Sequence, residues 1–291
     1  MMMPLKPTKH LVLKVLSVVL VSLLLLSGCS CYAPANPPSL PLPPTPPTSP
    51  VLPVTPEPTP EPVNTLPRAA IIDQLSVLNS NETFLKQVTQ ELEDYGFEVD
   101  IHKGDEITID FYRKLPQMDY QLIIFRAHSG LLSGEEGVVR MTTLFTNEAY
   151  SETKHVMEQL NDRVAKARID TKHPMIFSIK DSFVTKSMEG DFNNTVIIMM
   201  GCSCIAIDDL AQAFVDKGAS SYLAWHATVG LGYVDQATQH LLRQLCGERA
   251  TIAEAISSTM KTIGADPMFG AKLKYFPSQS RDKSLESILG F

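Results

Sequence analysis

Two apolar runs, each ending in a chemically reactive residue, decide the fold of this chain. They read Leu122-Ile-Ile-Phe-Arg-Ala-His128-Ser-Gly130 and Val196-Ile-Ile-Met-Met-Gly-Cys202-Ser-Cys204. Continuous apolar runs of this length are typical of parallel strands that are buried on both faces of a sheet. We therefore expect two buried strands whose carboxyl ends deliver His128 and Cys202.

Other apolar runs alternate with amphipathic segments on both sides of these two. The expected strands cover residues 68–73, 97–101, 120–125, 138–145, 175–179, 196–200 and 221–225, and the expected helices cover 84–95, 110–115, 207–215, 234–245 and 252–263. Such alternation implies parallel strands joined by crossover helices. The predicted fold class is α/β, a three-layer sandwich with a mostly parallel central sheet and helices on both faces. Residues 141–182 are expected to add a hairpin or lid.

The first 28 residues differ in composition from the rest of the chain. Lysines precede an apolar run from Val15 to Leu26, which is followed by Ser27-Gly28-Cys29. This order predicts a secretory signal peptide. Its end resembles a bacterial lipobox, which implies that Cys29 becomes the lipidated first residue of the mature protein. An uncleaved N-terminal anchor is the alternative. We expect a location in the cell envelope, lipid-anchored to the outer face of the cytoplasmic membrane or to another envelope membrane.

Residues 29–67 are predicted to form a proline-rich stalk. Fifteen of the 21 prolines lie between Pro34 and Pro67, and this composition favours polyproline II and supplies no core. Residues 68–291 are therefore expected to be one domain. The chain carries 25 basic and 32 acidic side chains, a formal net charge of −7. Such a balance argues against a nucleic-acid partner, because non-specific binding needs a basic face that displaces phosphate counterions.

The expected chemistry follows from the two strand ends. In parallel sheets, sites lie beyond the carboxyl ends of the strands. If the two strands are neighbours, the imidazole of His128 can withdraw the thiol proton of Cys202 and make the sulfur a nucleophile. The backbone N–H groups after His128 and at Cys202 are expected to form an oxyanion hole. Ser129 and Gly130 are expected to form the turn that faces the substrate.

These residues also carry a family resemblance. An apolar strand followed by histidine and a later strand followed by a small residue and cysteine resemble the caspase, gingipain, separase and CHAT group of cysteine peptidases. The downstream segments Asp209-Leu-Ala-Gln-Ala-Phe, Lys217-Gly-Ala-Ser-Ser-Tyr-Leu-Ala-Trp225 and Thr251-Ile-Ala-Glu-Ala are similar in order to the gingipain and CHAT branch. The resemblance implies a caspase-like fold, with His128 as general base and Cys202 as nucleophile. The family usually has glycine directly after the histidine, whereas Ser129 intervenes here.

Several alternatives remain at this edge. Cys204 is a rival nucleophile, and Cys202, Cys204, His128 and His226 make a four-ligand zinc site conceivable. Trp225 and His226 end another apolar run, where they either wall a substrate pocket or, for Trp225, belong to the core. Acidic candidates for a specificity pocket are Asp73, Glu135, Glu136, Asp208 and Asp209, of which Asp73 is the best placed. Asp235 is expected to cap its helix.

The sequence thus predicts a membrane-tethered, extracytoplasmic cysteine endopeptidase that acts on protein or peptide substrates through a Cys202–His128 dyad. The resemblance implies no organic cofactor, and no metal is expected. Two other functions stay open. One is a catalytically inactive caspase-like domain that binds peptide or protein at the same edge. The other is an extracytoplasmic solute-binding lipoprotein, although no second lobe of comparable size is evident.

Overall fold

The computed structural model describes residues 66–133 and 137–290. The predicted signal peptide, Cys29 and almost all of the predicted stalk fall on residues 1–65, outside the described residues, as do Glu135 and Glu136. Within the described part, no helix is both long enough and apolar enough to cross a membrane. The first strand begins at Arg68.

A six-stranded sheet forms the centre of the domain. Its strand order is β10-β9-β8-β3-β1-β2, and the pairs are parallel except for β10 with β9. The bounds are β1 Arg68–Asp73, β2 Glu98–Lys103, β3 Leu122–Arg126, β8 Val196–Met199, β9 Ser221–Trp225 and β10 Leu273–Phe276. β1, β3, β8 and β9 are almost entirely buried, as expected for strands covered on both faces.

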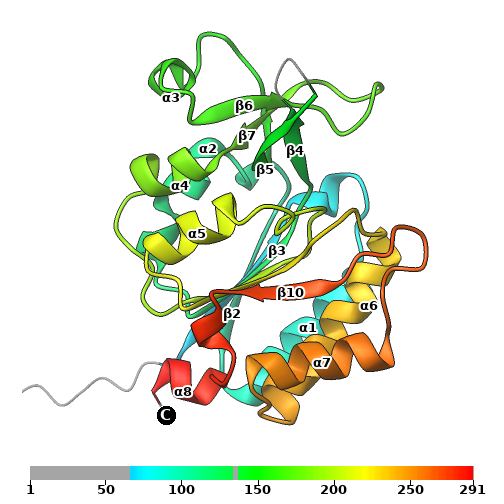
Figure 1. Cartoon of the computed structure of the whole chain (residues 1–291). Coiled ribbons are helices and arrows are strands. Elements are labelled where there is room, and N and C mark those ends of the chain that lie inside the picture. Colours follow the sequence, from blue (N-terminus) through cyan, green and yellow to red (C-terminus); the bar gives the residue numbers. More distant parts are fainter. Residues whose placement is uncertain (1–65, 134–136, 291) are drawn as a thin grey trace, which may run out of the picture. The chain divides into compact units, whose positions relative to one another are not determined.

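Helices cover both faces of this sheet (Figure 1). In β3, Leu122 and Ile124 pack with one helical layer, whereas Ile123 and Phe125 pack with the other, because successive strand side chains point to opposite faces. One layer holds α1 Glu82–Tyr95, α6 Leu231–Leu242, α7 Ile252–Thr262 and α8 Leu285–Leu289. The other holds α2 Ile109–Lys114, α4 Asp181–Ser187 and α5 Asp209–Asp216. The predicted α/β fold class is confirmed.

A second, antiparallel sheet lies in the part of the chain where a hairpin or lid was expected. Its order is β4-β5-β7-β6, and the bounds are β4 Ser129–Ser133, β5 Val139–Ala149, β6 Val164–Ala167 and β7 Ile176–Ile179, with α3 Val156–Leu160 between β5 and β6. The insertion is therefore larger than the expected hairpin. Leu144, Phe177 and Ile179 bury it against the layer of α2, α4 and α5, so it packs as part of the domain.

The helix ends follow the expected turn chemistry in some places and not in others. Gly96 ends α1 in the left-handed conformation with φ of 114°, which a residue with a Cβ rarely adopts. The side chain of Asn81 caps the start of that helix by accepting the N–H of Phe84. The expected cap at Asp235 is wrong, because α6 begins at Leu231 and Asp235 lies inside the helix.

Candidate functional site

The ends of β3 and β8 lie side by side. The two strands pair in parallel with Phe125 opposite Met199, and three further positions along this register bring His128 opposite Cys202. The contact continues past the strands, because the Ser129 hydroxyl donates a 2.6 Å hydrogen bond to the carbonyl oxygen of Cys202. Both residues therefore leave the same edge of the central sheet, as the sequence predicts.

Gly201 allows this close approach. A Cβ at position 201 would lie 2.3 Å from the Ser129 Oγ and 2.7 Å from the carbonyl oxygen of Ala127. The second contact is to backbone, which cannot rotate away. A glycine directly before Cys202 is therefore required for the two strand ends to stay together.

The two neighbouring cysteines have different surroundings. Cys204 is fully buried, and its thiol donates a 2.9 Å hydrogen bond to the Ser129 Oγ. Burial raises the pKa of the Cys204 thiol to about 12, so at neutral pH it carries almost no thiolate. Cys202 is only half-buried. Of the two, Cys202 has the exposure that a nucleophile needs.

His128 follows β3 and is half-buried. Burial lowers the pKa of its imidazole below the ordinary value, and the nearby His173 lowers it further. The ring is therefore neutral at pH 7 and able to accept a proton. The ring centroid lies 6.1 Å from that of Phe145 on β5, so the second sheet forms one wall beside the imidazole.

The thiol and the imidazole are not hydrogen-bonded to each other in this structure. The Cys202 Sγ instead donates to the carbonyl oxygen of Val229 at 3.7 Å. Val229 lies just before α6, so the connection from β9 to α6 forms the opposite wall of the site. Catalytic hydrogen bonds are often long or misaligned before a substrate binds, and rotation about the Cα–Cβ bond of Cys202 changes the direction of the thiol.

Gln74 holds the backbone at His128, and the sequence gave us no reason to single it out. It directly follows β1 and is fully buried. Its Oε1 accepts the N–H of His128 at 2.9 Å, while its Nε2 donates to the Asn147 Oδ1 at 2.7 Å and to the Thr146 carbonyl at 3.3 Å. One side chain thus ties His128 to the first strand and to the second sheet.

Replacing Gln74 with methionine is expected to lower the free energy of unfolding by about 2 to 3 kcal/mol, because buried donors and acceptors lose their partner. Urea unfolding followed by circular dichroism measures the change. Gln90→Met is the matched control, since the Gln90 amide donates to Asp94 on the exposed face of α1, and it should cost less than about 0.5 kcal/mol. Equal losses in the two variants would contradict the assigned role.

Asp73 does not present a free carboxylate to a pocket. It is fully buried, and its Oδ1 accepts a 2.8 Å hydrogen bond from the guanidinium of Arg126. The same guanidinium, also fully buried, donates to both carboxylate oxygens of Asp235 at 2.9 and 3.1 Å. This placement corrects the expectation that Asp73 contacts substrate. The Asp73–Arg126–Asp235 ion triad instead joins β1, β3 and α6 next to the site.

The remaining candidates lie around the same edge. Trp225 is 1% exposed and packs edge-on against Tyr233 with ring centroids 5.5 Å apart, so it is a core residue and not a pocket wall. The Nδ1 of the half-buried His226 accepts the backbone N–H of Lys272 at 3.0 Å. Asp209 accepts the N–H groups of Thr142 and Leu210, and Asp208 is exposed.

The four residues weighed as zinc ligands are all described. Cys204 and His226 are engaged in the hydrogen bonds given above. Within residues 66–133 and 137–290, no group of three or more His, Cys, Asp and Glu side chains is arranged to hold a metal ion.

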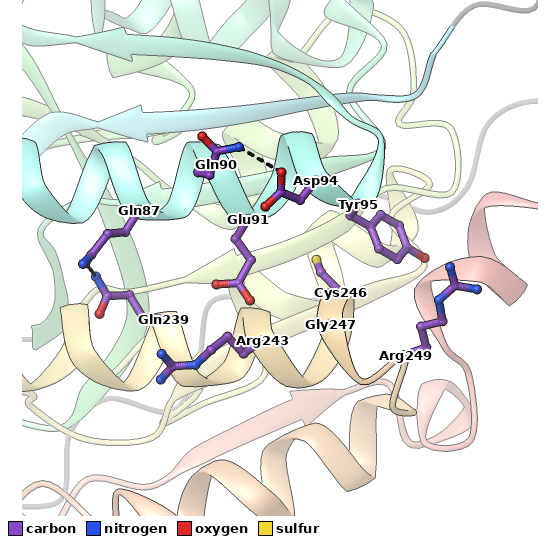
Figure 2. Close-up of a pocket in the computed structure, with 10 residues that line it drawn as sticks. All are labelled: Gln87, Gln90, Glu91, Asp94, Tyr95, Gln239, Arg243, Cys246, Gly247 and Arg249. Carbon is purple, nitrogen blue, oxygen red and sulfur yellow. Dashed lines mark hydrogen bonds between the residues drawn. The ribbon is translucent and has the colours of Figure 1, made fainter.

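A polar groove of about 610 Å³ lies at the other end of the sheet (Figure 2). It runs between α1 and the π-helical turn Arg243–Gly247 that follows α6, and its lining includes Gln87, Glu91, Arg243 and Cys246. Both helices begin near the strand carboxyl ends, so their last turns lie at the opposite edge. Burial, followed by the charge of Glu91, raises the pKa of the Cys246 thiol to about 12. The groove is separate from the candidate site.

Comparison with known proteins gives two distant likenesses in structure. No protein-family model matches the chain, and no curated protein matches it. The chain is similar to the Arg-specific cysteine proteinase gingipain R, with 12% identity, a TM-score of 0.41, and coverage of 68% of this chain and 42% of that one. It is also similar to a Streptococcus pneumonia TIGR4 flavodoxin, with 14% identity, a TM-score of 0.31, and coverage of 62% and 98%.

The chain therefore spans less than half the length of the gingipain R structure. Neither likeness carries a statement about function. The functional argument rests on the residues of this chain.

Proposed function

We propose that this protein is a caspase-like cysteine endopeptidase of the gingipain and CHAT type, with Cys202 as nucleophile and His128 as general base. The observation that carries the proposal is the parallel pairing of β3 with β8, continued by the Ser129–Cys202 hydrogen bond. A half-buried thiol and an imidazole that is neutral at pH 7 leave one edge of the sheet. The order of the sequence segments adds to this support.

In the proposed reaction, His128 takes the proton of the Cys202 thiol as the sulfur attacks the carbonyl carbon of a peptide bond. The resulting tetrahedral oxyanion collapses to a thioester, and the protonated His128 gives its proton to the departing amine. Water, deprotonated by His128, then hydrolyses the thioester and restores the thiol. The thiol must turn from Val229 towards the imidazole for the first step.

The proposed oxyanion donors are the backbone N–H groups of Ser129 and Cys202. Phe145 donates its N–H to the carbonyl oxygen of His128, which makes His128 and Phe145 a hydrogen-bonded pair of the antiparallel ladder. Ser129, at the next position, then belongs to a non-hydrogen-bonded pair, whose N–H points away from β5. This leaves the N–H of Ser129 available for an oxyanion.

We further propose that the domain acts outside the cytoplasm, tethered to an envelope membrane through lipidated Cys29. This part rests on the sequence of residues 1–67 alone. A stalk of polyproline II would extend about 3.1 Å per residue, or roughly 100 Å in all. Its substrates would then be proteins or peptides in the cell envelope.

The second candidate is a caspase-like domain without activity that binds peptide or protein at the same edge. The observation that favours it is the hydrogen bond from the Cys202 thiol to Val229, which leaves the imidazole without a thiol partner. The extracytoplasmic solute-binding alternative has less support, because the described residues from Pro67 onward fall into one compact unit.

Alkylation with iodoacetamide separates the two candidates. We expect Cys202 to react at pH 7 at least tenfold faster than Cys204 and Cys246, because burial raises the pKa of both of these thiols to about 12. His128→Ala should slow the reaction of Cys202 to the rate of an ordinary thiol. Peptide mapping by mass spectrometry reports each cysteine separately.

His226→Ala is the matched control, since this imidazole follows β9 at the same edge but bonds the backbone of Lys272. It should leave the rate at Cys202 unchanged. Slow labelling of Cys202, equal in the parent protein and in His128→Ala, would refute the dyad and favour the binding domain.

A further inference from the structure

The connection between α7 and β10 is fixed beside the candidate site. The carboxylate of Asp266 is buried, and its Oδ2 accepts the N–H of Gly230 at 2.8 Å. Gly230 follows Val229, whose carbonyl oxygen accepts the Cys202 thiol. Figure 1 shows this connection next to the start of α6. Two hydrogen bonds and one peptide link therefore join the nucleophile to this connection.

The same carboxylate determines which side chains face outward. Its Oδ1 accepts the N–H groups of Met268 at 2.9 Å and Phe269 at 2.7 Å, and a further backbone bond joins Gly270 to the carbonyl oxygen of Asp266. Burial alone would raise the pKa of Asp266, but the three N–H donors together outweigh burial and hold it below the ordinary value. The turn therefore stays bonded at neutral pH.

Two large apolar side chains project from this ordered turn. Met268 is 79% exposed and Phe269 is 47% exposed. A single exposed apolar residue is ordinary, but two adjacent ones on a fixed turn beside a reactive group point to a contact surface. On the opposite wall, the half-buried ring of Phe145 lies next to the imidazole of His128. The site is apolar on both sides.

Most carboxylates near this edge are already engaged. Asp73 and Asp235 share the guanidinium of Arg126, and Asp209 and Asp266 accept backbone N–H groups. Among the described acids near the site, the exposed Asp208 has no such bond. A cationic side chain of a substrate would therefore meet apolar surface and carboxylates that already have partners.

We propose that the site binds peptides with a bulky apolar side chain next to the scissile bond, and that Met268 and Phe269 contact this side chain. The proposal rests on the function proposed above and specifies its substrate class. It distinguishes this chain from a peptidase that selects arginine, lysine or aspartate at that position.

Peptidyl acyloxymethyl ketones test the preference. The Cys202 thiolate forms a C–S bond to the methylene carbon beside the ketone, and the carboxylate leaves. Three such probes differ only in the residue next to the ketone, which is leucine, arginine or aspartate. We expect the leucine probe to label Cys202 of the full chain at least tenfold faster than the other two, because its side chain is removed from water. Mass spectrometry measures each rate.

Variants then locate the subsite. Met268→Ser combined with Phe269→Ser should reduce the preference for leucine to less than threefold. The matched control is Met157→Ser combined with Leu160→Ser, which removes two similarly exposed side chains from α3, and it should retain the full preference.

The outcomes separate the two proposals. Rapid, His128-dependent labelling by iodoacetamide together with equal or faster labelling by the arginine or aspartate probe would overturn the apolar subsite and leave the peptidase intact. A leucine preference that survives the Met268 and Phe269 replacements would overturn their assignment. Slow iodoacetamide labelling that does not depend on His128 would overturn both proposals.

Discussion

Replacing Cys202 with serine is expected to abolish peptide hydrolysis. The hydroxyl is far less acidic than a thiol, and the site is arranged for a larger, more nucleophilic sulfur. Removing the nucleophile of a catalytic unit typically costs several orders of magnitude, so we expect the hydrolysis of fluorescein-labelled casein to fall by about a thousandfold or more, to background. The increase of fluorescence with time measures the rate.

Cys204→Ser is the matched control for this change. It makes the same substitution two residues away, at a thiol that is buried against the hydroxyl of Ser129, and it should keep at least about a tenth of the hydrolysis rate. If Cys204→Ser removes the activity and Cys202→Ser does not, the nucleophile has been assigned to the wrong cysteine. Hydrolysis that survives both changes would refute the thiol mechanism.

Replacing Arg126 with methionine is expected to produce the largest loss of stability. The guanidinium pairs with the carboxylates of Asp73 and Asp235, and all three side chains are buried. Without it, two carboxylates remain close together with no countercharge. Breaking a buried ion pair in this way costs about 3 to 5 kcal/mol, which urea unfolding at pH 7 measures directly.

The control for Arg126 is Arg68→Met. Arg68 forms an ion pair with Asp100 in which each side chain is 37% exposed, and its loss should cost less than about 1 kcal/mol. Adding Asp73→Asn and Asp235→Asn to Arg126→Met should restore part of the stability, because the buried charges are then gone. A similar loss in the Arg68 and Arg126 variants would contradict the importance of the ion triad.

The loss should also depend on pH. Burial already raises the pKa of Asp73 above its ordinary value, and removing the guanidinium raises it further. A carboxyl whose pKa is higher in the folded state binds more protons folded than unfolded, so its contribution to stability falls as pH rises above the unfolded value. The deficit of Arg126→Met should therefore shrink as the pH is lowered from about 7 to 5.

The central strands could be predicted because burial on both faces leaves a clear pattern. The first strand was expected at residues 68–73 and is found at Arg68–Asp73, and the strand ending in Trp225 was placed with the same bounds. β10 was missed because Leu273-Lys-Tyr-Phe is short and only its first residue is fully buried. β6 was missed for a similar reason, since Ala165 and Lys166 interrupt its burial.

The site could be predicted only where neighbouring strands determine it. The adjacency of the His128 and Cys202 segments follows from parallel pairing, which a sequence pattern can indicate. Asp235 was expected to cap a helix because acids are common at helix starts, but its partner Arg126 is 109 residues away. Gln74 and Asp266 act through contacts of the same long-range kind, and the sequence offers no local signal for them.

The chain passes from the central sheet to the second sheet within two residues. β3 ends at Arg126 and β4 begins at Ser129, so His128 belongs to the joint, whereas Cys202 follows a strand of the central sheet. A tilt of the second sheet therefore changes the separation of base and nucleophile, with the Ser129–Cys202 hydrogen bond as the pivot. Mechanical load on the outer sheet is in this way converted into proton-transfer distance.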